Sequence, residues 1–504
     1  MLARLPSASP VRQQLGRGPP KRVCRDESFL VRRSRGNRPA GLDVLDKQSP
    51  SRHDIADELS WGRPELGSPR SRPSEPRRLS RRRHPYRDLA ALILATYFAV
   101  TALYVVATAW AVSTGRLPAT GRWQGAFQDA LLPRINEVVV FTFFAACGAS
   151  VGSFLNVVVW RLPQGLGVGG HSFCPRCRNT LRVRDNVPVF GWLWLGGRCR
   201  DCRLPISPRY PIVEACLAVT FALVGTVELY GWNLPFQSTP FRWSMDSPRV
   251  SGTQLLTAIY HLVGLSVAWA MGLIRYDGNR IPSPLVIFAA VWLMGGQLLC
   301  PSLGIVPWQM TVPTDWPPAD WLQSGQWTFD SAMVTNALMR LLTALAAAAF
   351  FARVLARACC PHADLKLDPM GEQTGRLIDL TLLIAVVSLM VGWQATSGVL
   401  VAASGLAWLW GRIIEQDVAV ADRHNALARL AVCLPVVLTC QIVLWRSLSQ
   451  SGWWPGEHSS PGLIMAYGLG TLLIPLWLRD PLKWDHAPPP HDPSPGIEQR
   501  IDRE

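Results

Sequence analysis

Four cysteines in two Cys-x-x-Cys pairs are the residues of this sequence most clearly spaced for chemistry. Cys174 pairs with Cys177 and Cys199 with Cys202, and 21 residues separate the two pairs. Two such turns, each aiming both sulfurs at one metal, are typical of a structural zinc site with four thiolate ligands. The gap is slightly longer than the usual ~15–20 residues, so we expect the second pair on a longer hairpin. The alternative is two disulfides or four inert thiols.

Long apolar runs occupy much of the remaining chain. Of the 504 residues, 49% are hydrophobic and only 17% are charged, which is typical of a multi-pass membrane protein. We predict an all-α polytopic membrane fold of about ten transmembrane helices, with a small cytoplasmic zinc-binding loop domain. The spans are expected near residues 89–112, 137–160, 211–230, 255–274, 283–299, 332–356, 377–393, 397–410, 427–444 and 463–478.

The distribution of arginine predicts how the chain is oriented in the lipid bilayer. The net charge of +15 comes mostly from loops and from the N-terminal arm, so membrane orientation explains it better than nucleic acid, which we do not expect as a partner. The loop 161–210 carries nine arginines against two aspartates. By the positive-inside rule, the N-terminus and this loop face the cytoplasm, where disulfides are rare.

Several short motifs surround the two cysteine pairs. They are GSFLNVVVWRLP at 152–163, CPRC at 174–177, NVPV at 186–189, GRCR at 197–200 and ISPRYPIVE at 206–214. In this order they resemble the N-terminal domain of bacterial prepilin peptidases, the bifunctional leader peptidase/N-methyltransferases of type IV pilus and type II secretion systems. The last motif ends at Glu214. Its carboxylate either belongs to the site or suits the positive end of the third span's helix dipole.

This resemblance and the changes in composition divide the chain into regions. Residues 1–87 are rich in Arg, Pro and Ser, so we expect a disordered basic arm. The other expected regions are an extra transmembrane helix and outer loop at 88–135, the prepilin peptidase N-terminal domain at 136–230 with its zinc loop at 161–210, a membrane aspartic peptidase-like domain at 254–411, additional transmembrane helices at 412–478 and a disordered tail at 479–504.

The resemblance implies an aspartic peptidase, whose chemistry needs two carboxylates that share one proton and one water. Asp277 and Asp364 both follow predicted spans and are both expected at the cytoplasmic membrane surface. We therefore predict these two residues as the catalytic dyad. Asp379, at the start of a predicted span, is a rival for the second role, because an ionisable residue there is a candidate functional residue.

The catalytic motifs of the family are only partly present. The family's first aspartate stands six residues before an Ile/Leu-Pro-Asp motif, and here that position is Arg275, while the last position of the motif is Ser283. The second family motif, Gly-x-Gly-Asp-x-Lys, has its nearest match at 361–366, without either glycine. An arginine at a dyad position would lower a neighbouring carboxyl pKa, which opposes a shared proton.

The resemblance implies a membrane-embedded aspartic endopeptidase that cleaves the leaders of prepilin- or pseudopilin-like substrates at the cytoplasmic face of the bacterial inner membrane. It also implies structural zinc, and S-adenosylmethionine as the donor for N-methylation of the new N-terminus. We favour an active peptidase with a shifted dyad. A catalytically degenerate, client-binding membrane scaffold and a protein with methyltransferase activity alone are the alternatives. A transporter is disfavoured because few charges lie inside the predicted spans.

Overall fold

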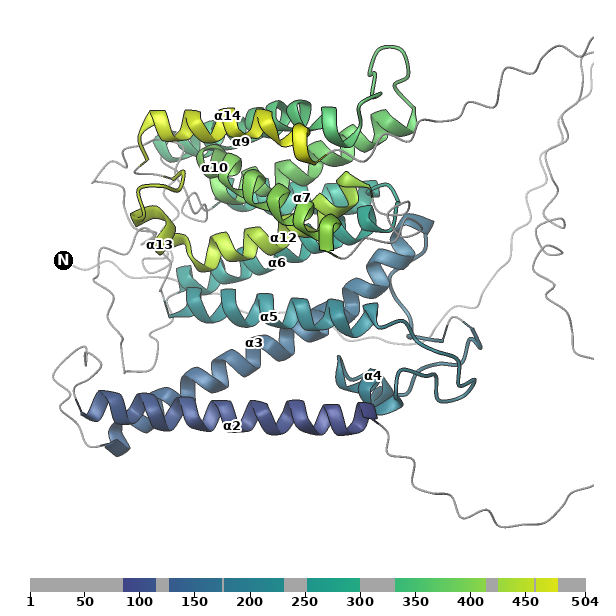
Figure 1. Ribbon diagram of the computed structural model, residues 1–504, viewed down its shortest axis with the longest axis vertical. Helices are drawn as coiled ribbons and strands as arrows, with labels where there is room; N and C mark the ends of the chain where they lie inside the picture. The colour runs from purple at the N-terminus through teal and green to yellow at the C-terminus, as the bar shows by residue number, and fades with distance from the viewer. Residues whose placement is uncertain are drawn as a thin grey trace, which may run out of the picture. The chain divides into compact units, whose positions relative to one another are not determined.

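The computed structural model describes residues 85–114, 127–230, 252–299, 331–413 and 425–478, apart from residues 175, 457 and 458. All of them belong to one compact unit, Ser80–Glu504. The predicted tail at 479–504 and the predicted arm lie outside these residues, except that the first helix begins at Pro85. The long helices are α2 (Pro85–Ser113), α3 (Phe127–Arg161), α5 (Arg209–Leu229), α6 (Gly252–Tyr276), α7 (Ser283–Leu299), α9 (Ser331–Cys359), α10 (Glu372–Ile413), α12 (Ala426–Val443) and α14 (Pro461–Trp477) (Figure 1).

The predicted all-α membrane fold is confirmed. Seven of these helices are long and apolar enough to cross a membrane, and α7 and α14 are shorter apolar helices. Within the described part of the chain the only β pairing is two isolated bridges in the zinc loop, Phe173 with Thr180 and Arg198 with Pro205. The count of about ten spans remains a prediction, because helix length and composition alone do not show where a membrane lies.

Helix α10 contains two of the predicted spans. Its 42 residues are interrupted at Gly392, whose φ of 80° and ψ of 165° are not helical. The Ser388 and Thr396 hydroxyl oxygens lie 3.1 Å apart, whereas eight residues of straight helix would separate them by about 12 Å. The chain therefore bends sharply at Gly392, where only glycine adopts the required positive φ without a steric penalty.

A pair of glycines sets how closely α3 and α5 approach each other. A Cβ atom on Gly148 would lie 2.3 Å from the Leu217 carbonyl oxygen, and one on Gly152 would lie 2.7 Å from the Glu214 Cα. These glycines, four residues apart on α3, let the two backbones touch, as small-xxx-small motifs do in membrane helix pairs. This packing brings the end of α3 and the start of α5 together, and the zinc loop connects the two.

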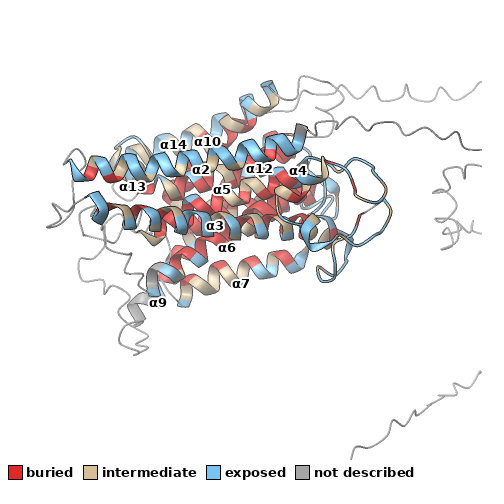
Figure 2. Cartoon of the chain, turned by 90° about the horizontal axis from the view of Figure 1, so that it is seen from below, coloured by how far each residue is buried: buried red, intermediate tan, exposed pale blue. Residues whose placement is uncertain are grey.

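Helix α6 lies among α3, α5, α7, α10 and α12. Leu265, Met271 and Ile274 on this helix are almost completely buried. Buried residues gather on these inner helices, whereas α2 is mostly exposed (Figure 2). The exposed residues of α2 include Phe98 and Leu103, which suits a helix that faces lipid.

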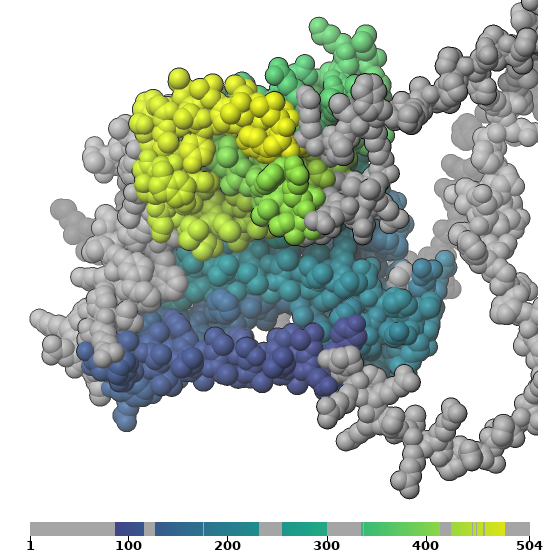
Figure 3. All heavy atoms as spheres, in the orientation of Figure 1, coloured from purple at the N-terminus to yellow at the C-terminus, as the bar shows by residue number. Residues whose placement is uncertain are grey.

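Helix α2 packs mainly against α3 and the short helix α4 (Phe190–Leu195) of the zinc loop. In the space-filling view an opening separates α2, in purple, from the teal helices (Figure 3). At its start, the Tyr86 ring packs edge-on against Trp192, and Arg87 donates a hydrogen bond to the Trp194 carbonyl oxygen. These contacts hold α4 against α2 and so fix one side of the zinc loop.

Candidate functional site

The four predicted cysteine ligands lie together at the centre of the zinc loop. Their sulfur atoms are all within 4.8 Å of one another, and the Cys174–Cys202 and Cys177–Cys199 sulfur distances are both 3.9 Å. Four sulfurs placed tetrahedrally at about 2.3 Å from a zinc ion would be separated by about 3.8 Å. All four thiols are free, so the alternative reading as disulfides is wrong. The cluster can hold a metal ion.

The two cysteine turns share one backbone design. In the first, the Cys174 carbonyl oxygen accepts a hydrogen bond from the Arg178 amide at 2.8 Å; in the second, the Cys199 carbonyl oxygen accepts one from the Arg203 amide at 3.1 Å. Both arginines have positive φ, 58° and 61°, in the left-handed region that usually favours glycine. Each turn thus presents two sulfurs on a tight loop, as a metal knuckle does.

The environment of Cys174 favours the ionised form that binds metals. Burial raises the pKa of this thiol, but hydrogen bonds from the backbone of Cys177 and Arg176 and from neighbouring thiols outweigh burial and bring the pKa down to about 7. About half of such thiols are ionised at neutral pH, and the thiolate is the metal-binding form. In the same cluster, backbone hydrogen bonds lower the pKa values of Cys177 and Cys202, but burial and hydrogen bonds with the neighbouring thiols outweigh them, raising the pKa of Cys177 to about 11 and that of Cys202 above its usual value. Of these three thiols, Cys174 therefore ionises most readily.

An ion pair closes the loop around the second knuckle. Arg200 donates a 2.7 Å hydrogen bond from Nε to Asp185 Oδ2, and its terminal nitrogen contacts Oδ1. The Asp185 side chain is buried, and the Arg200 guanidinium holds the pKa of its carboxyl below the usual range. At the start of the zinc loop, Arg161, the last residue of α3, donates hydrogen bonds to the carbonyl oxygens of Gly169 and His171. Its guanidinium also lies over the Phe173 ring.

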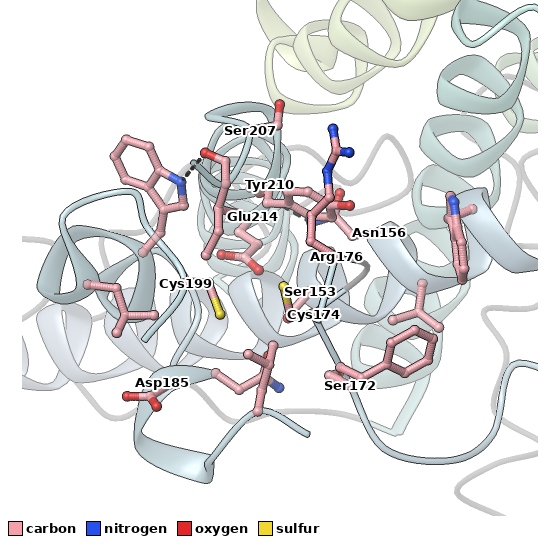
Figure 4. A pocket seen from close by; sticks show the side chains of 18 of the residues that line it. Ser153, Asn156, Ser172, Cys174, Arg176, Asp185, Cys199, Ser207, Tyr210 and Glu214 are labelled. Atoms are coloured by element: carbon pink, nitrogen blue, oxygen red, sulfur yellow. Dashed lines mark hydrogen bonds between the residues drawn. The ribbon is translucent and has the colours of Figure 1, made fainter. Parts of the chain in front are cut away.

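A cavity of about 350 Å³ lies between the knuckles and the adjoining ends of α3 and α5. Most of its wall is apolar, with aromatic rings from Trp160, Phe173, Trp192 and Tyr210. Figure 4 shows the Glu214 carboxylate among the side chains that line it. A mostly apolar cavity of this size with few polar groups is typical of a ligand site.

Glu214 does not cap its own helix in the structure. Its Oε2 accepts a 2.6 Å hydrogen bond from the Val189 amide in the zinc loop, and Ser153 of α3 lines the same cavity. Of the two interpretations that the sequence left open, these contacts favour a role in the site over a role as a helix-capping charge.

Val189 holds a strained backbone conformation next to this carboxylate. Its φ of 62° and ψ of −56° place it at the centre of a γ-turn, in which the Phe190 amide donates to the Pro188 carbonyl oxygen at 2.7 Å. Positive φ is rare for a β-branched residue, and such strain gathers at functional sites. No sequence signal predicts this strain, because Val-Phe is not a turn sequence.

The three candidate aspartates lie in turns or at a helix start, and each has a different partner. Asp277 forms a two-pronged ion pair with Arg209, with nitrogen–oxygen distances of 2.6 and 2.7 Å. No sequence motif identifies Arg209 as the partner of Asp277. This pair joins the start of α5 to the turn after α6, so both lie at one end of the helix bundle.

Asp379 is buried at the start of α10. Its Oδ2 lies 3.1 Å from the Arg275 guanidinium, and both side chains are at most 4% exposed. Its Oδ1 accepts a 3.3 Å hydrogen bond from the Ile281 amide, and Arg275 also donates to the Asn279 carbonyl oxygen. Arg275, which occupies the position of the family's first aspartate, thus forms an ion pair with Asp379.

Asp364 lies exposed in the loop between α9 and α10. One of its oxygens accepts hydrogen bonds from the amides of Lys366 and Leu367, at 2.8 and 3.1 Å. These backbone hydrogen bonds hold the pKa of the Asp364 carboxyl below its usual range. No hydrogen bond or ion pair within the described ranges joins Asp277 to Asp364 or to Asp379. The catalytic dyad therefore remains a prediction.

The fold and the four-thiol cluster together define a polytopic membrane protein with a metal-knuckle domain between two closely packed helices. Residues 146–227 match the model of the bacterial Peptidase A24 N-terminal domain. The resemblance of this segment, hereafter the A24 N-terminal domain, to the bacterial prepilin peptidases is confirmed.

Curated relatives agree over a similar length. The Escherichia coli O78:H11 "Type 4 prepilin-like proteins leader peptide-processing enzyme" is 43% identical over 107 residues, covering 17% of this chain and 40% of the relative. The "Prepilin leader peptidase/N-methyltransferase" of Klebsiella pneumoniae is 43% identical over 106 residues, which cover 19% of this chain and 46% of the relative. The protein of the same name from Myxococcus xanthus is 43% identical over 92 residues, which cover 18% of this chain and 27% of the relative.

This chain therefore spans less than half the length of these relatives. No solved structure matches it.

Proposed function

We propose that this protein binds the N-terminal segments of prepilin-like membrane clients through its A24 N-terminal domain and does not cleave them. The support for the client class is the naming of the relatives, which are leader peptidases for prepilins or prepilin-like proteins. The apolar helices support a place in the bacterial inner membrane, with the arginine-rich zinc loop on the cytoplasmic side.

One observation supports binding without cleavage. Asp277 and Asp379 are each paired with an arginine, Arg209 and Arg275, while Asp364 accepts hydrogen bonds from its own turn. An aspartic peptidase needs two adjacent carboxyl groups that share one proton. An arginine beside a carboxylate favours its ionised form, which opposes that sharing.

Cleavage by a shifted dyad is the second candidate, and one contact favours it. The Ile281 amide donates to Asp379, so the turn that follows Asp277 touches the start of α10. Release of Arg209 and Arg275 by a bound client would leave two carboxylates on adjoining segments. This mechanism would use Asp277 with Asp379 in place of Asp364.

The proposed metal is zinc in a structural role. The four thiols and their spacing fit tetrahedral zinc, which would need no further ligand and would leave no open position for catalysis. The metal would then serve to hold the loop against α3 and α5. The support for N-methylation is the printed name of relatives such as that of Klebsiella pneumoniae, and S-adenosylmethionine would be the methyl donor.

The test is co-expression of the full chain with a tagged prepilin-like protein in bacterial membranes. We expect the client to co-purify with its leader uncut, and Asp277→Ala, Asp364→Ala and Asp379→Ala to give the same result. Glu372→Gln, at an exposed residue of α10, is the matched control.

Three outcomes decide between the candidates. An uncut client that co-purifies supports binding without cleavage. Leader removal by the parent that is lost in Asp277→Ala and Asp379→Ala establishes the shifted dyad. Neither co-purification nor cleavage overturns the client class itself.

A further inference from the structure

Helices α5 and α6 run side by side and are joined by two pairs of ionisable side chains (Figure 1). The first is the Arg209–Asp277 ion pair, whose side chains are 38% and 23% exposed. The second joins Glu228, near the end of α5, to His261 of α6 through a hydrogen bond between the carboxylate and Nδ1. Glu228 follows Arg209 by 19 positions of helix, so the two pairs lie about 28 Å apart along α5.

The Glu228–His261 pair lies inside the part of the protein that is apolar enough to cross a membrane. The two residues belong to the candidate membrane spans Arg209–Leu229 and Leu255–Tyr276. Both side chains are only 2% exposed, and Glu228 Oε2 and His261 Nε2 have no hydrogen-bond partner among the described residues. Ionisable side chains in such a place are costly, and they commonly mark proton-binding positions.

Within the described ranges, no other charged group acts on the Glu228–His261 pair. The helices packed against α5 and α6 are α3, α7, α10 and α12, and α7 has no charged residue. On α3, Arg134 and Glu137 form an ion pair with each other. The Tyr260 ring packs edge-on against His261, but its hydroxyl group donates to a carbonyl oxygen of α7. The two side chains can therefore compensate only each other's charge.

The total charge of this pair depends on one proton. An ionised Glu228 beside a neutral His261 leaves one uncompensated negative charge among apolar helices. One added proton makes the pair neutral overall. The proton can rest on the imidazole, which gives a carboxylate–imidazolium pair, or on the carboxyl group, which gives two neutral partners. A neutral pair avoids most of the free-energy cost of a buried charge, so the packing of α5 on α6 favours it.

We propose that Glu228 and His261 form an intramembrane proton-binding site, and that the packing of α5 on α6 is most stable while one proton is bound there. The ligand is a proton taken from solvent, and its release leaves a charge that opposes the helix contact. Because α5 begins at the zinc loop and α6 ends next to Asp277, a change in this contact would reach both. The site is independent of client binding and of leader cleavage.

The test compares unfolding midpoints of the full chain in nanodiscs between about pH 6 and about pH 9, where an ordinary histidine loses its proton. In the unfolded chain the histidine is neutral over most of this range, so folding must take up one proton to fill the pair. A protein that binds more protons when folded becomes less stable as the pH rises. Over this range we expect the midpoint of the parent to fall by about 5 °C more than that of the double variant Glu228→Gln/His261→Gln.

The two single variants separate the effect of charge from the effect of a lost hydrogen bond. Glu228→Gln leaves a neutral imidazole, and its midpoint should stay close to that of the double variant. His261→Gln leaves a buried carboxylate without any partner for its charge, so it should be the least stable protein of the series. Loss of a hydrogen bond alone would instead lower the midpoints of both single variants equally.

The exposed Glu372–Arg376 pair supplies the matched control. Replacing both of its residues by glutamine should leave the pH dependence of the parent unchanged, because neither side chain titrates between about pH 6 and about pH 9. Hydrogen exchange of the α5 and α6 amides should show that the effect of pH on the parent is centred on the contact between these helices.

A second measurement does not depend on how well the glutamine variants fold. NMR of nitrogen-labelled histidine and infrared spectroscopy of labelled glutamate report where the proton lies in the parent. Glu228→Asp keeps a carboxyl group and serves to assign the His261 signal. At about pH 8 we expect either an imidazolium at His261 or a protonated carboxyl group at Glu228, while exposed histidines are neutral.

A proton on either member of the pair, together with the steeper pH dependence of the parent, confirms the site. A neutral His261 beside an ionised Glu228 overturns it. Parallel pH profiles of the parent and the double variant, or equal losses in the two single variants, overturn it as well.

Discussion

Two regions of this protein hold their ionisable side chains differently. In the A24 N-terminal domain, the four thiols face one another and the Glu214 carboxylate accepts a hydrogen bond from a backbone amide, although Asp185 there pairs with Arg200. At the ends of α6 and α10, Asp277 and Asp379 are each matched by an arginine. The thiols of the first region are left to hold a metal, whereas the two aspartates of the second region are already neutralised by arginines near the missing family motifs.

The largest effect is expected from removing a thiol of the first region. Cys199→Ser should reduce bound metal from about one ion per chain to near none, because a three-thiol site loses most of its affinity. The loop 161–210, whose arginine side chains are mostly exposed already, should then lose its ordered backbone and be cut faster by trypsin after those arginines. Metal analysis measures the bound ion, and limited proteolysis measures the cutting of the loop. Cys216→Ser on α5 is the control, since Cys216 lies outside the cluster. Full metal retention in Cys199→Ser would contradict the four-thiol site.

The second region should respond to removal of Arg275. Arg275→Ala leaves Asp379 buried without its cation and should destabilise the helix bundle by about 3–5 kcal/mol, measured by thermal unfolding in detergent. Replacing both residues together, by Met and Leu, should recover most of that loss. The exposed Glu372–Arg376 pair is the control and should contribute at most about 1 kcal/mol. A double variant no more stable than Arg275→Ala would show that the unpaired Asp379 charge is not the cause of the lost stability.

The helix contact that supports the first region can be broken with one methyl group. Gly152→Ala would place a Cβ atom 2.7 Å from the Glu214 Cα, so we expect a loss of about 1–3 kcal/mol and a displaced carboxylate. Gly295→Ala on α7 is the matched control, because a Cβ atom there meets open space. Thermal unfolding of the two variants should separate them clearly, and equal midpoints would argue against the close packing of α3 and α5.

The smallest effect concerns the exposed loop of Asp364. The pKa of the Asp364 carboxyl is lower in the folded loop than in the unfolded chain. The ionised carboxylate therefore stabilises the loop at pH values above the ordinary Asp pKa. This stabilisation is lost as the pH falls through the lowered, folded-state pKa. Protection of the Lys366 and Leu367 amides from hydrogen exchange should follow this course. Asp364→Asn keeps an acceptor and should preserve protection, whereas Asp364→Ala should lose it. If Asp364 were catalytic, both variants would lose leader cleavage alike.

Much of the A24 N-terminal domain was predictable from the sequence because its features are local. A Cys-x-x-Cys turn forms from residues close in the chain, so the four ligands could be named from spacing, and apolar runs alone predict helices of membrane length. The glycine pair at 148 and 152 also has the four-residue spacing of a helix-packing motif.

The partners of the aspartates could not be predicted in the same way. Asp277 pairs with a residue 68 positions away and Asp379 with one 104 positions away. Such contacts depend on which helix ends meet, which neither composition nor periodicity specifies. The prediction of Asp277 with Asp364 placed both residues beyond helix ends at the same membrane surface but could not assign their hydrogen bonds.

Short stretches of chain encode the helices, the two Cys-x-x-Cys turns and the resemblance of residues 146–227 to the A24 N-terminal domain, so these features could be predicted without the fold. The packing of the helices brings Glu214 to the Val189 amide of the zinc loop and pairs Arg209 and Arg275 with two candidate catalytic aspartates. These contacts were not predictable because the state of a charge depends on what surrounds it in space. In a helix bundle, those neighbours come from segments that are distant in the sequence.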